Sequence, residues 1–231
     1  MAPIRPVVIA AALLGLGGCM QAVSQSADKI ADVIHRAAYT DEVAIDPAAL
    51  PRYAPGDRFD FTGGRTEQVR AVGKGRVTWD LSGKQTYVTD GNFALPRLEW
   101  RRAKDRGEST VTKRSGSLWP LESGARARYT VVSERTRTGS GETRRRDRIY
   151  HCTVERTERV SVPAGTFDAF RVECLRYNRS NTRIVLQRIW HYAPEVGHYV
   201  RREIVNKSAG TRKVAELVSY TRAPARSAAR K

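Results

Sequence analysis

Between Arg148 and Tyr177 the chain reads RIYHCTVERTERVSVPAGTFDAFRVECLRY. Apolar residues occupy every second position in both arms of this segment. They are Cys152, Val154, Val160 and Val162 before the turn, and Phe170, Val172 and Cys174 after it. Such alternation is typical of strands with one buried face. Pro163 fixes φ for a turn and Gly165 tolerates a positive φ, so the chain is expected to reverse there. The segment is therefore predicted to be the central antiparallel hairpin of an all-β domain.

Short strand patterns separated by glycine-containing turns continue on both sides of this hairpin. The expected strands are Arg58–Phe61, Thr66–Val72, Arg76–Leu81, Gln85–Thr89, Arg97–Arg101, Ser109–Lys113, Ala125–Arg135, Arg183–Tyr192, His198–Val205 and Lys213–Thr221. The regular spacing predicts an antiparallel meander that forms a curved sheet, a sandwich or a half-barrel. Two related β units, residues 51–115 and 116–222, are one interpretation, because each half carries a tryptophan-bearing strand. One continuous curved sheet explains the same pattern.

The first residues have the anatomy of an export signal. Arg5 gives a positive start, and Val7–Leu16 is apolar throughout. This length matches a signal h-region of roughly 7–15 residues and is too short for a membrane span. Residues 1–18 are therefore expected to be a signal peptide.

The sequence Leu16-Gly17-Gly18-Cys19 ends this segment and resembles the lipobox of bacterial lipoproteins. The resemblance implies cleavage before Cys19 and attachment of lipid, with palmitate among the acyl chains, to its thiol. An ordinary cleaved signal is the alternative. Met20 stands where an Asp would retain such a protein in the inner membrane of enteric-type bacteria. The expected location is therefore the cell envelope, at the outer membrane and facing the periplasm.

Residues 19–50 are expected to form a lipidated N-terminus, a helix and a linker. Apolar side chains recur at helical spacing between Ala22 and Tyr39, which predicts one short helix. We expect this helix to pack on the β domain, and a spacer or membrane-surface helix is the alternative. Asp46-Pro47 and Leu50-Pro51 then break the chain. Residues 223–231 are interpreted as a basic, flexible tail.

The three cysteines separate into one lipid site and one pair. With Cys19 lipidated, Cys152 and Cys174 remain, and the hairpin brings them roughly opposite each other. An even pair in an oxidising compartment favours a disulfide. A metal-binding pair is the alternative, but no further ligands lie at useful spacing.

Two turn motifs carry a further resemblance. Val162-Pro163-Ala164-Gly165-Thr166-Phe167 and Trp190-His191-Tyr192-Ala193-Pro194, with Gly197, resemble the paired signature of a broad group of exported bacterial β-proteins of unknown function. The resemblance covers roughly residues 120–205. His191 departs from the signature, in which an aromatic residue directly follows the tryptophan. No catalytic residue is implied. By their residue types, both motifs are turns, and Phe167, Trp190 and Tyr192 are expected core anchors.

Recognisable catalytic and metal motifs are absent from the sequence. The four histidines, His35, His151, His191 and His198, form no HxH, HExxH or Cys/His zinc pattern, and no Gly-x-Ser-x-Gly elbow occurs. Charged residues on the strands are interpreted as solvent-facing. We therefore expect no catalytic residue, no metal and no cofactor, although an enzyme can assemble a site from distant residues.

Charge is the more informative property. The chain has 41 Lys and Arg against 24 acidic residues, for a formal net charge of +17. Arg144, Arg145, Arg146 and Arg148 cluster beside a turn over Thr136–Thr143, with Arg144, Arg146 and Arg148 on one strand face. Arginine suits phosphate because its planar fork donates two hydrogen bonds. Export argues against nucleic acid, so the expected anions are lipid head groups or lipopolysaccharide. A solvated basic face is the bland alternative.

Two hypotheses of different class follow from these observations. The first is a non-enzymatic, membrane-anchored envelope lipoprotein whose β scaffold binds an anionic or amphipathic envelope component or a protein partner. The second is a hydrolase-like envelope enzyme with a site assembled between strands. A deep cleft with converging histidines and carboxylates would favour the enzyme, whereas an arginine-lined concave sheet would favour the scaffold. The ligand, the partner and the oligomeric state do not follow from the sequence.

Overall fold

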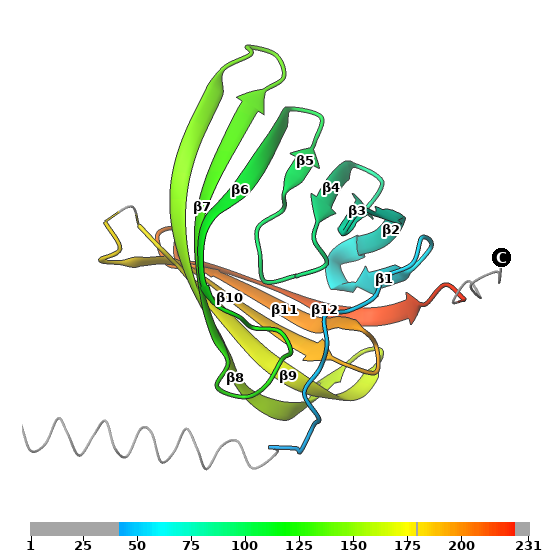
Figure 1. Ribbon diagram of the computed structural model, residues 1–231. Helices are drawn as coiled ribbons and strands as arrows, with labels where there is room; N and C mark the ends of the chain where they lie inside the picture. The colour runs from blue at the N-terminus through cyan, green and yellow to red at the C-terminus, as the bar shows by residue number, and fades with distance from the viewer. Residues whose placement is uncertain (1–41, 179, 225–231) are drawn as a thin grey trace, which may run out of the picture. The chain divides into compact units, whose positions relative to one another are not determined.

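A computed structural model describes residues 42–178 and 180–224, and its strands belong to one compact unit (Figure 1). One 3-10 turn, η1 (Thr62–Gly64), accompanies the strands. The strands are β1 (Arg58–Phe61), β2 (Arg65–Gly73), β3 (Arg76–Leu81), β4 (Gln85–Thr89), β5 (Glu99–Arg101), β6 (Asp105–Gly116), β7 (Arg126–Arg137), β8 (Thr143–Val162), β9 (Gly165–Tyr177), β10 (Ile184–Ala193), β11 (His198–Asn206) and β12 (Thr211–Thr221). The all-β, antiparallel class predicted from the sequence is confirmed.

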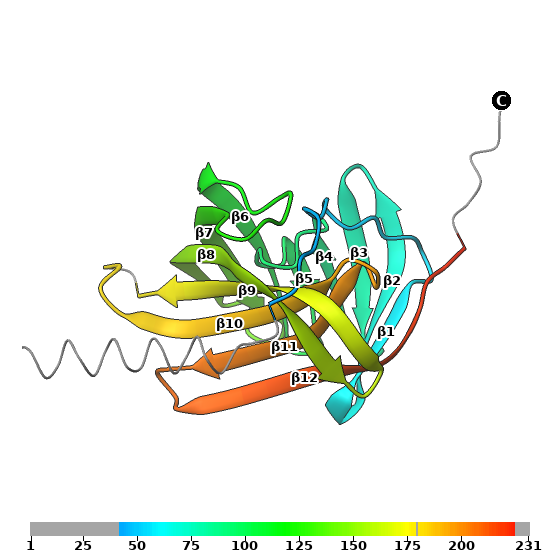
Figure 2. The same ribbon diagram turned by 90° about the horizontal axis from the view of Figure 1, so that it is seen from below.

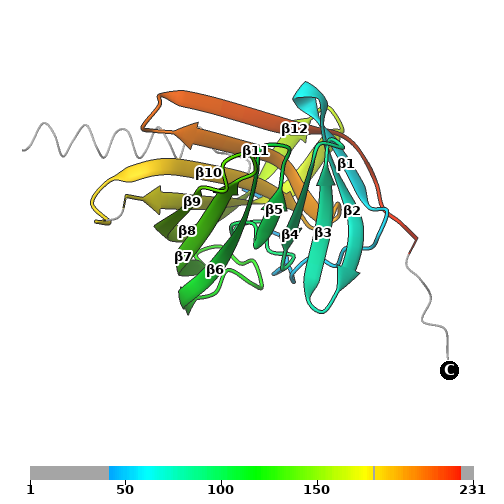
Figure 3. The same cartoon turned by 90° about the horizontal axis from the view of Figure 1, so that it is seen from above.

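The sheet closes on itself. Each strand pairs with the next along the chain, and β1 pairs with β12 to complete a barrel. Figures 2 and 3 show the strands arranged around the barrel in chain order. Neither a sandwich nor a half-barrel is formed, because the β1–β12 pairing leaves no open sheet edge. Across residue 115, where the two expected units would meet, β6 pairs with β7 from Asp105↔Arg137 to Gly116↔Ala127. The strands of residues 51–115 and 116–222 therefore lie in one sheet.

The central hairpin is formed by β8 and β9. Pro163 and Ala164 are its two loop residues, between the paired Val162 and Gly165. A register shift between Val154 and Arg156 marks a bulge in β8. A bulge bends its strand, and the 20 residues of β8 sweep from the top to the bottom of the barrel wall in Figure 1.

Cys152 and Cys174 are paired in the register of this hairpin and form a disulfide. Their Cα atoms lie 4.0 Å apart, and both residues are 1% exposed. The disulfide therefore joins β8 and β9 on the inner face of the sheet, within the core.

Two short turns have the backbone conformation that joins neighbouring antiparallel strands. The β2–β3 turn contains Lys74 and Gly75 with φ of 51° and 69°, and the β3–β4 turn contains Ser82 and Gly83 with φ of 50° and 64°. Two consecutive residues with positive φ are the mark of a type I′ hairpin, whose twist matches that of the flanking strands.

The upper end of β7 and β8 extends beyond the neighbouring strand. β9 pairs with β8 only from Ile149↔Tyr177 downward, so residues 143–148 pair with β7 alone. In Figure 1 this hairpin rises above β6 and β9. The sequence predicted a wider turn over Thr136–Thr143, whereas the loop spans residues 138–142.

Aromatic side chains pack against one another in the barrel core. Phe93 stacks on Tyr192 with ring centroids 5.4 Å apart, and Trp119 and Trp190 also contact Phe93. Phe167, Trp190 and Tyr192 are buried, which confirms the expected core anchors. The non-strand segment before β1 also joins the core, since Ala48 bridges Leu121 and Tyr53 is buried.

Several expectations lie outside the described residues. They are the signal peptide, lipidated Cys19, the helix within residues 22–39 and most of the tail over 223–231. Within the part of the chain that is described, no helix is long and apolar enough to cross a membrane.

Candidate functional site

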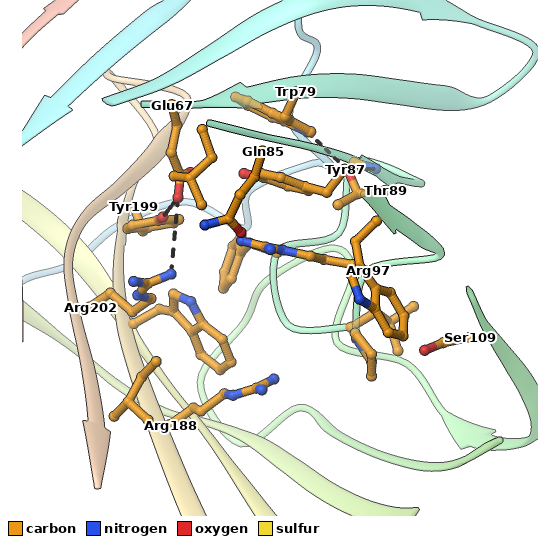
Figure 4. A pocket seen from close by; sticks show the side chains of 18 of the residues that line it. Glu67, Trp79, Gln85, Tyr87, Thr89, Arg97, Ser109, Arg188, Tyr199 and Arg202 are labelled. Atoms are coloured by element: carbon orange, nitrogen blue, oxygen red, sulfur yellow. Dashed lines mark hydrogen bonds and ion pairs between the residues drawn. The ribbon is translucent and has the colours of Figure 1, made fainter. Parts of the chain in front are cut away.

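A cavity of about 520 Å³ lies inside the barrel. This volume falls in the range of small-molecule sites, roughly 300–1,000 Å³. Figure 4 shows side chains from several strands converging on it. Its principal lining residues are Arg65, Glu67, Trp79, Tyr87, Arg97, Trp100, Arg102, Ser109, Arg148, Tyr150, Arg176, Arg188, Trp190, His198, Tyr199 and Arg202.

The cavity is strongly cationic. Among the described residues, seven arginines line it and Glu67 is the only acidic side chain that does so. The arginines are Arg65, Arg97, Arg102, Arg148, Arg176, Arg188 and Arg202. A buried charge is normally paired, since removing it from water costs several kcal/mol per ion. An interior with this charge balance is therefore unusual and points to a site for an anion.

Glu67 is already fully occupied by its neighbours. The carboxylate accepts a hydrogen bond of 2.6 Å from Tyr199 Oη and forms ion pairs with Arg65 and Arg202, the latter at 4.0 Å. Its side chain is 2% exposed. Burial opposes ionisation, but Arg65, His198 and Arg202 outweigh it and hold the pKa of Glu67 well below its usual value. This carboxylate is therefore ionised and compensates the two arginines beside it.

His198 connects Glu67 to the barrel core. Its Nδ1 lies 2.8 Å from Tyr53 Oη, and its Nε2 lies 3.3 Å from Glu67 Oε2. Burial lowers the pKa of His198, although Glu67 acts in the opposite direction. A neutral ring satisfies both contacts when Tyr53 donates to Nδ1 and Nε2–H donates to Glu67. We therefore interpret this network as structural, because each of its polar side-chain groups has a partner.

Arg97 and Arg188 have no such compensation. Within the described parts of the chain, neither has an ion pair, and Arg188 Nε is buried without a hydrogen-bond partner. Figure 4 shows both side chains reaching into the cavity, Arg97 from the β4–β5 connection and Arg188 from β10. Burial lowers the pKa of both, and Arg176 and Arg202 lower that of Arg188 further, while Tyr150 opposes them. Both nonetheless remain protonated at neutral pH, as arginines do in proteins.

Aromatic faces are the partners that these two arginines do have. The Arg97 guanidinium lies 4.0 Å from the ring centroid of Tyr87, and that of Arg188 lies 5.9 Å from the centroid of Tyr150. A cation–π contact contributes about 0.5–2 kcal/mol, which is less than the desolvation cost of a buried ion. The N–H groups at the guanidinium edges therefore stay available to an anion.

Arg148 connects the cavity to the upper hairpin. Its Nη1 donates to Ser133 Oγ at 2.9 Å, and Ser133 Oγ in turn lies 2.8 Å from Ser109 Oγ. Arg148 lines the cavity and also a second, smaller hollow of about 120 Å³ along the hairpin. The remaining residues of that hollow are Trp100, Ser133, Arg135, Arg137, Glu142, Arg144 and Arg146.

The four arginines predicted as an anion-binding cluster do not share one face. Arg144, Arg146 and Arg148 have the same parity as buried Tyr150, and all three line the smaller hollow, so they lie on the inner face. Arg145 lies on the outer face, where it contacts Glu134 at 3.4 Å. The predicted ladder of three arginines is therefore present, and Arg145 is not part of it.

His151 and His191, the other two histidines of the described residues, do not line the cavity. His191 Nε2 lies 2.7 Å from Glu158 Oε1, which also accepts from Arg156 through its other oxygen. Glu158 is buried, contrary to the expectation that strand charges face solvent, and its carboxylate is paired with Arg156 and His191. No group of three or more His, Cys, Asp or Glu suited to a metal ion occurs in the described ranges.

Residues 129–221 match the family model described as DUF3108-like. The matched region is less than half of the chain and runs from within β7 to the end of β12. It contains both turn motifs that carry the resemblance noted from the sequence. A comparison with curated proteins found no match.

The comparison with solved structures found similarities at low sequence identity. The hypothetical lipoprotein YmcC from Escherichia coli K12 has a TM-score of 0.48 at 10% identity, over 73% of this chain and 84% of that one. A Bacteroides fragilis protein of YmcC-like fold has a TM-score of 0.40 at 11% identity, over 76% of this chain and all 100% of that one.

Proposed function

We propose that this protein is a membrane-anchored envelope lipoprotein whose barrel binds an anionic, amphipathic ligand in its interior without chemically changing it. The cationic cavity carries this proposal, since its charge exceeds what Glu67 compensates. The ligand classes that fit are the phosphorylated amphiphiles of the envelope, anionic lipid or lipopolysaccharide. The apolar part of such a ligand would contact the aromatic walls.

Anchoring rests on the sequence alone. The Leu16-Gly17-Gly18-Cys19 motif at the end of an apolar segment supports a lipid on Cys19. Two or more acyl chains give stable attachment, whereas one gives only marginal binding. Mass spectrometry of the mature amino terminus should find a lipidated Cys19, and density fractionation should place the protein with outer membranes. An unmodified Cys19 would refute the anchor.

Ligand binding is testable with a matched pair of dyes. The anionic dye 1-anilinonaphthalene-8-sulfonate and the neutral N-phenyl-1-naphthylamine share an aromatic skeleton and differ in the sulfonate. The mature chain with Cys19→Ser, which carries no lipid, should bind the anionic dye at least about tenfold more tightly, because a hydrogen bond to a charged group contributes about 1.5–3 kcal/mol.

Variants connect this preference to the cavity. Replacing Arg97 and Arg188 together with Gln should abolish the preference for the anionic dye. A control with Arg70→Gln and Arg145→Gln removes two exposed arginines, 59% and 65% exposed, and should keep the preference. Equal binding of the two dyes by the unmodified cavity, or an unchanged preference in the cavity variant, would overturn the proposal.

A further inference from the structure

The inner face of the β7–β8 hairpin continues the cavity outward. Arg148 is paired with Val131 in the register of this hairpin. Two residues further toward the loop, Arg146 is paired with Ser133, and two residues beyond that, Arg144 is paired with Arg135. Arg148 and Trp100 line both the cavity and the hollow along the hairpin. The two spaces therefore share a wall, and the arginines of β8 lead from one to the other.

The charge along this face is only partly compensated. Glu142 contacts Arg144 at 2.6 Å and Arg137 at 3.9 Å, and Asp105 contacts Arg135 at 2.7 Å. Among the described residues, no ion pair engages Arg146 or Arg148, although Arg148 donates to Ser133. The stretch nearest the cavity is therefore the most available to an anion.

The spacing of these arginines sets a distance for their ligand. Alternate residues of an antiparallel strand lie about 7 Å apart, so Arg144, Arg146 and Arg148 span about 14 Å. This is longer than one phosphate or sulfonate group and would take anionic groups repeated at about the same interval.

Phosphate matches the site better than carboxylate does. Several guanidiniums face the same space, and Arg176 and Arg188 lie close enough for one to lower the pKa of the other. A phosphate offers up to three oxygens to several arginine forks, whereas a carboxylate offers two and is saturated sooner.

We propose that the ligand is an elongated molecule with more than one phosphate group, held at one end in the barrel cavity and along the Arg144–Arg146–Arg148 ladder at the other. This inference rests on the proposed function and specifies its ligand. It assigns the ladder to the same ligand as the cavity, and not to a flat membrane surface.

A chain-length series tests the inference. Pyrophosphate, tripolyphosphate and polyphosphate of about fifteen units should displace the anionic dye from the mature Cys19→Ser chain. At equal phosphate concentration, the longest chain is expected to compete at least about tenfold better than pyrophosphate, since each added charge-assisted contact contributes on that order. Polyglutamate of similar length should compete less well.

Two variants separate this inference from the proposed function. Arg144→Gln with Arg146→Gln should remove the gain with chain length and leave dye binding unchanged. Arg145→Gln, on the outer face of the same strand, should keep the gain. The proposal of an extended phosphate ligand would be overturned by any of three results. Competition could fail to improve with chain length, the improvement could persist in the ladder variant, or polyglutamate could compete as well as polyphosphate. Loss of dye preference only in the Arg97 and Arg188 variant would still support the cavity.

Discussion

Replacing Glu67 with Gln should destabilise the barrel by about 3 kcal/mol, because breaking a buried ion pair leaves its partners charged and unpaired. Glu67 is 2% exposed, and its partners Arg65 and Arg202 are each 20% exposed. Gln keeps the shape, and its carbonyl oxygen can still accept the hydrogen bond from Tyr199. Its amide nitrogen can donate to His198 Nε2 once the ring takes its other neutral tautomer, in which Nδ1–H donates to Tyr53 Oη. The change therefore isolates the negative charge.

The size of the effect follows from the exposure of the two arginines. Removing one member of a fully buried pair costs about 3–5 kcal/mol. Since both guanidiniums retain some contact with water, the lower end of that range applies. At an m-value of about 2 kcal/mol/M, the urea midpoint should fall by about 1.5 M.

The effect should depend on pH in a defined direction. The pKa of Glu67 is held well below its usual value in the folded barrel, against about 4.3 in an unfolded chain. The stabilisation by Glu67 is therefore fully present above the unfolded pKa and is lost as pH falls through the folded one. Urea titrations at pH 7 and below pH 4 should show a large difference between the wild type and Glu67→Gln at pH 7, and a smaller one in acid.

A surface carboxylate provides the control. Glu99 pairs with Arg76 at 2.5 Å, and both are more than half exposed. Glu99→Gln should cost less than about 1 kcal/mol, as exposed pairs usually do. The reasoning would be refuted if Glu67→Gln lowered the free energy of unfolding at pH 7 no more than Glu99→Gln does, or raised it. The ion pairs of Glu67 would then not stabilise the barrel.

Three further predictions concern the disulfide, a close contact and the cavity charge. Replacing both hairpin cysteines with Ala should cost about 3 kcal/mol by the chain-entropy model for a separation of 22 residues, measured by thermal unfolding without reductant; an unchanged midpoint would contradict this. Gly107→Ala places a methyl group against the Trp100 indole and should cost about 1–3 kcal/mol, whereas Gly139→Ala points into open space and should be nearly neutral in the same denaturation assay. Glu67→Gln should also bind the anionic dye more tightly although it is less stable, since it removes the one negative charge lining the described cavity; weaker binding would contradict this reading.

Local patterns in the sequence predicted most of the strands. The alternation around Cys152 and Cys174 located the hairpin, its turn and the disulfide, because each depends on residues close in sequence or directly paired across one turn. Barrel closure was not predicted. The pairing of Arg58 with Thr221 joins the two ends of the sheet, and no local signal specifies a contact of such long range.

The cavity was missed because charged residues on strands were interpreted as solvent-facing. Arg188 stands at the parity of buried Leu186 and Trp190, and Glu67 at that of buried Val69. A charged residue at a position whose parity predicts burial was therefore the signal in the sequence that could have indicated the cavity. The ladder of Arg144, Arg146 and Arg148 was predicted from parity, but its connection to a cavity depends on how β8 curves.

The most direct test of an anion site inside the barrel is to locate a bound anion. Crystals of the mature Cys19→Ser chain soaked in tungstate, a heavy phosphate analogue, would show the anion by anomalous scattering. We predict that the strongest peak lies inside the barrel, within hydrogen-bond distance of Arg97 or Arg188, and that it is lost in the variant with both arginines replaced by Gln. Peaks only on the outer surface, with an empty cavity, would contradict it.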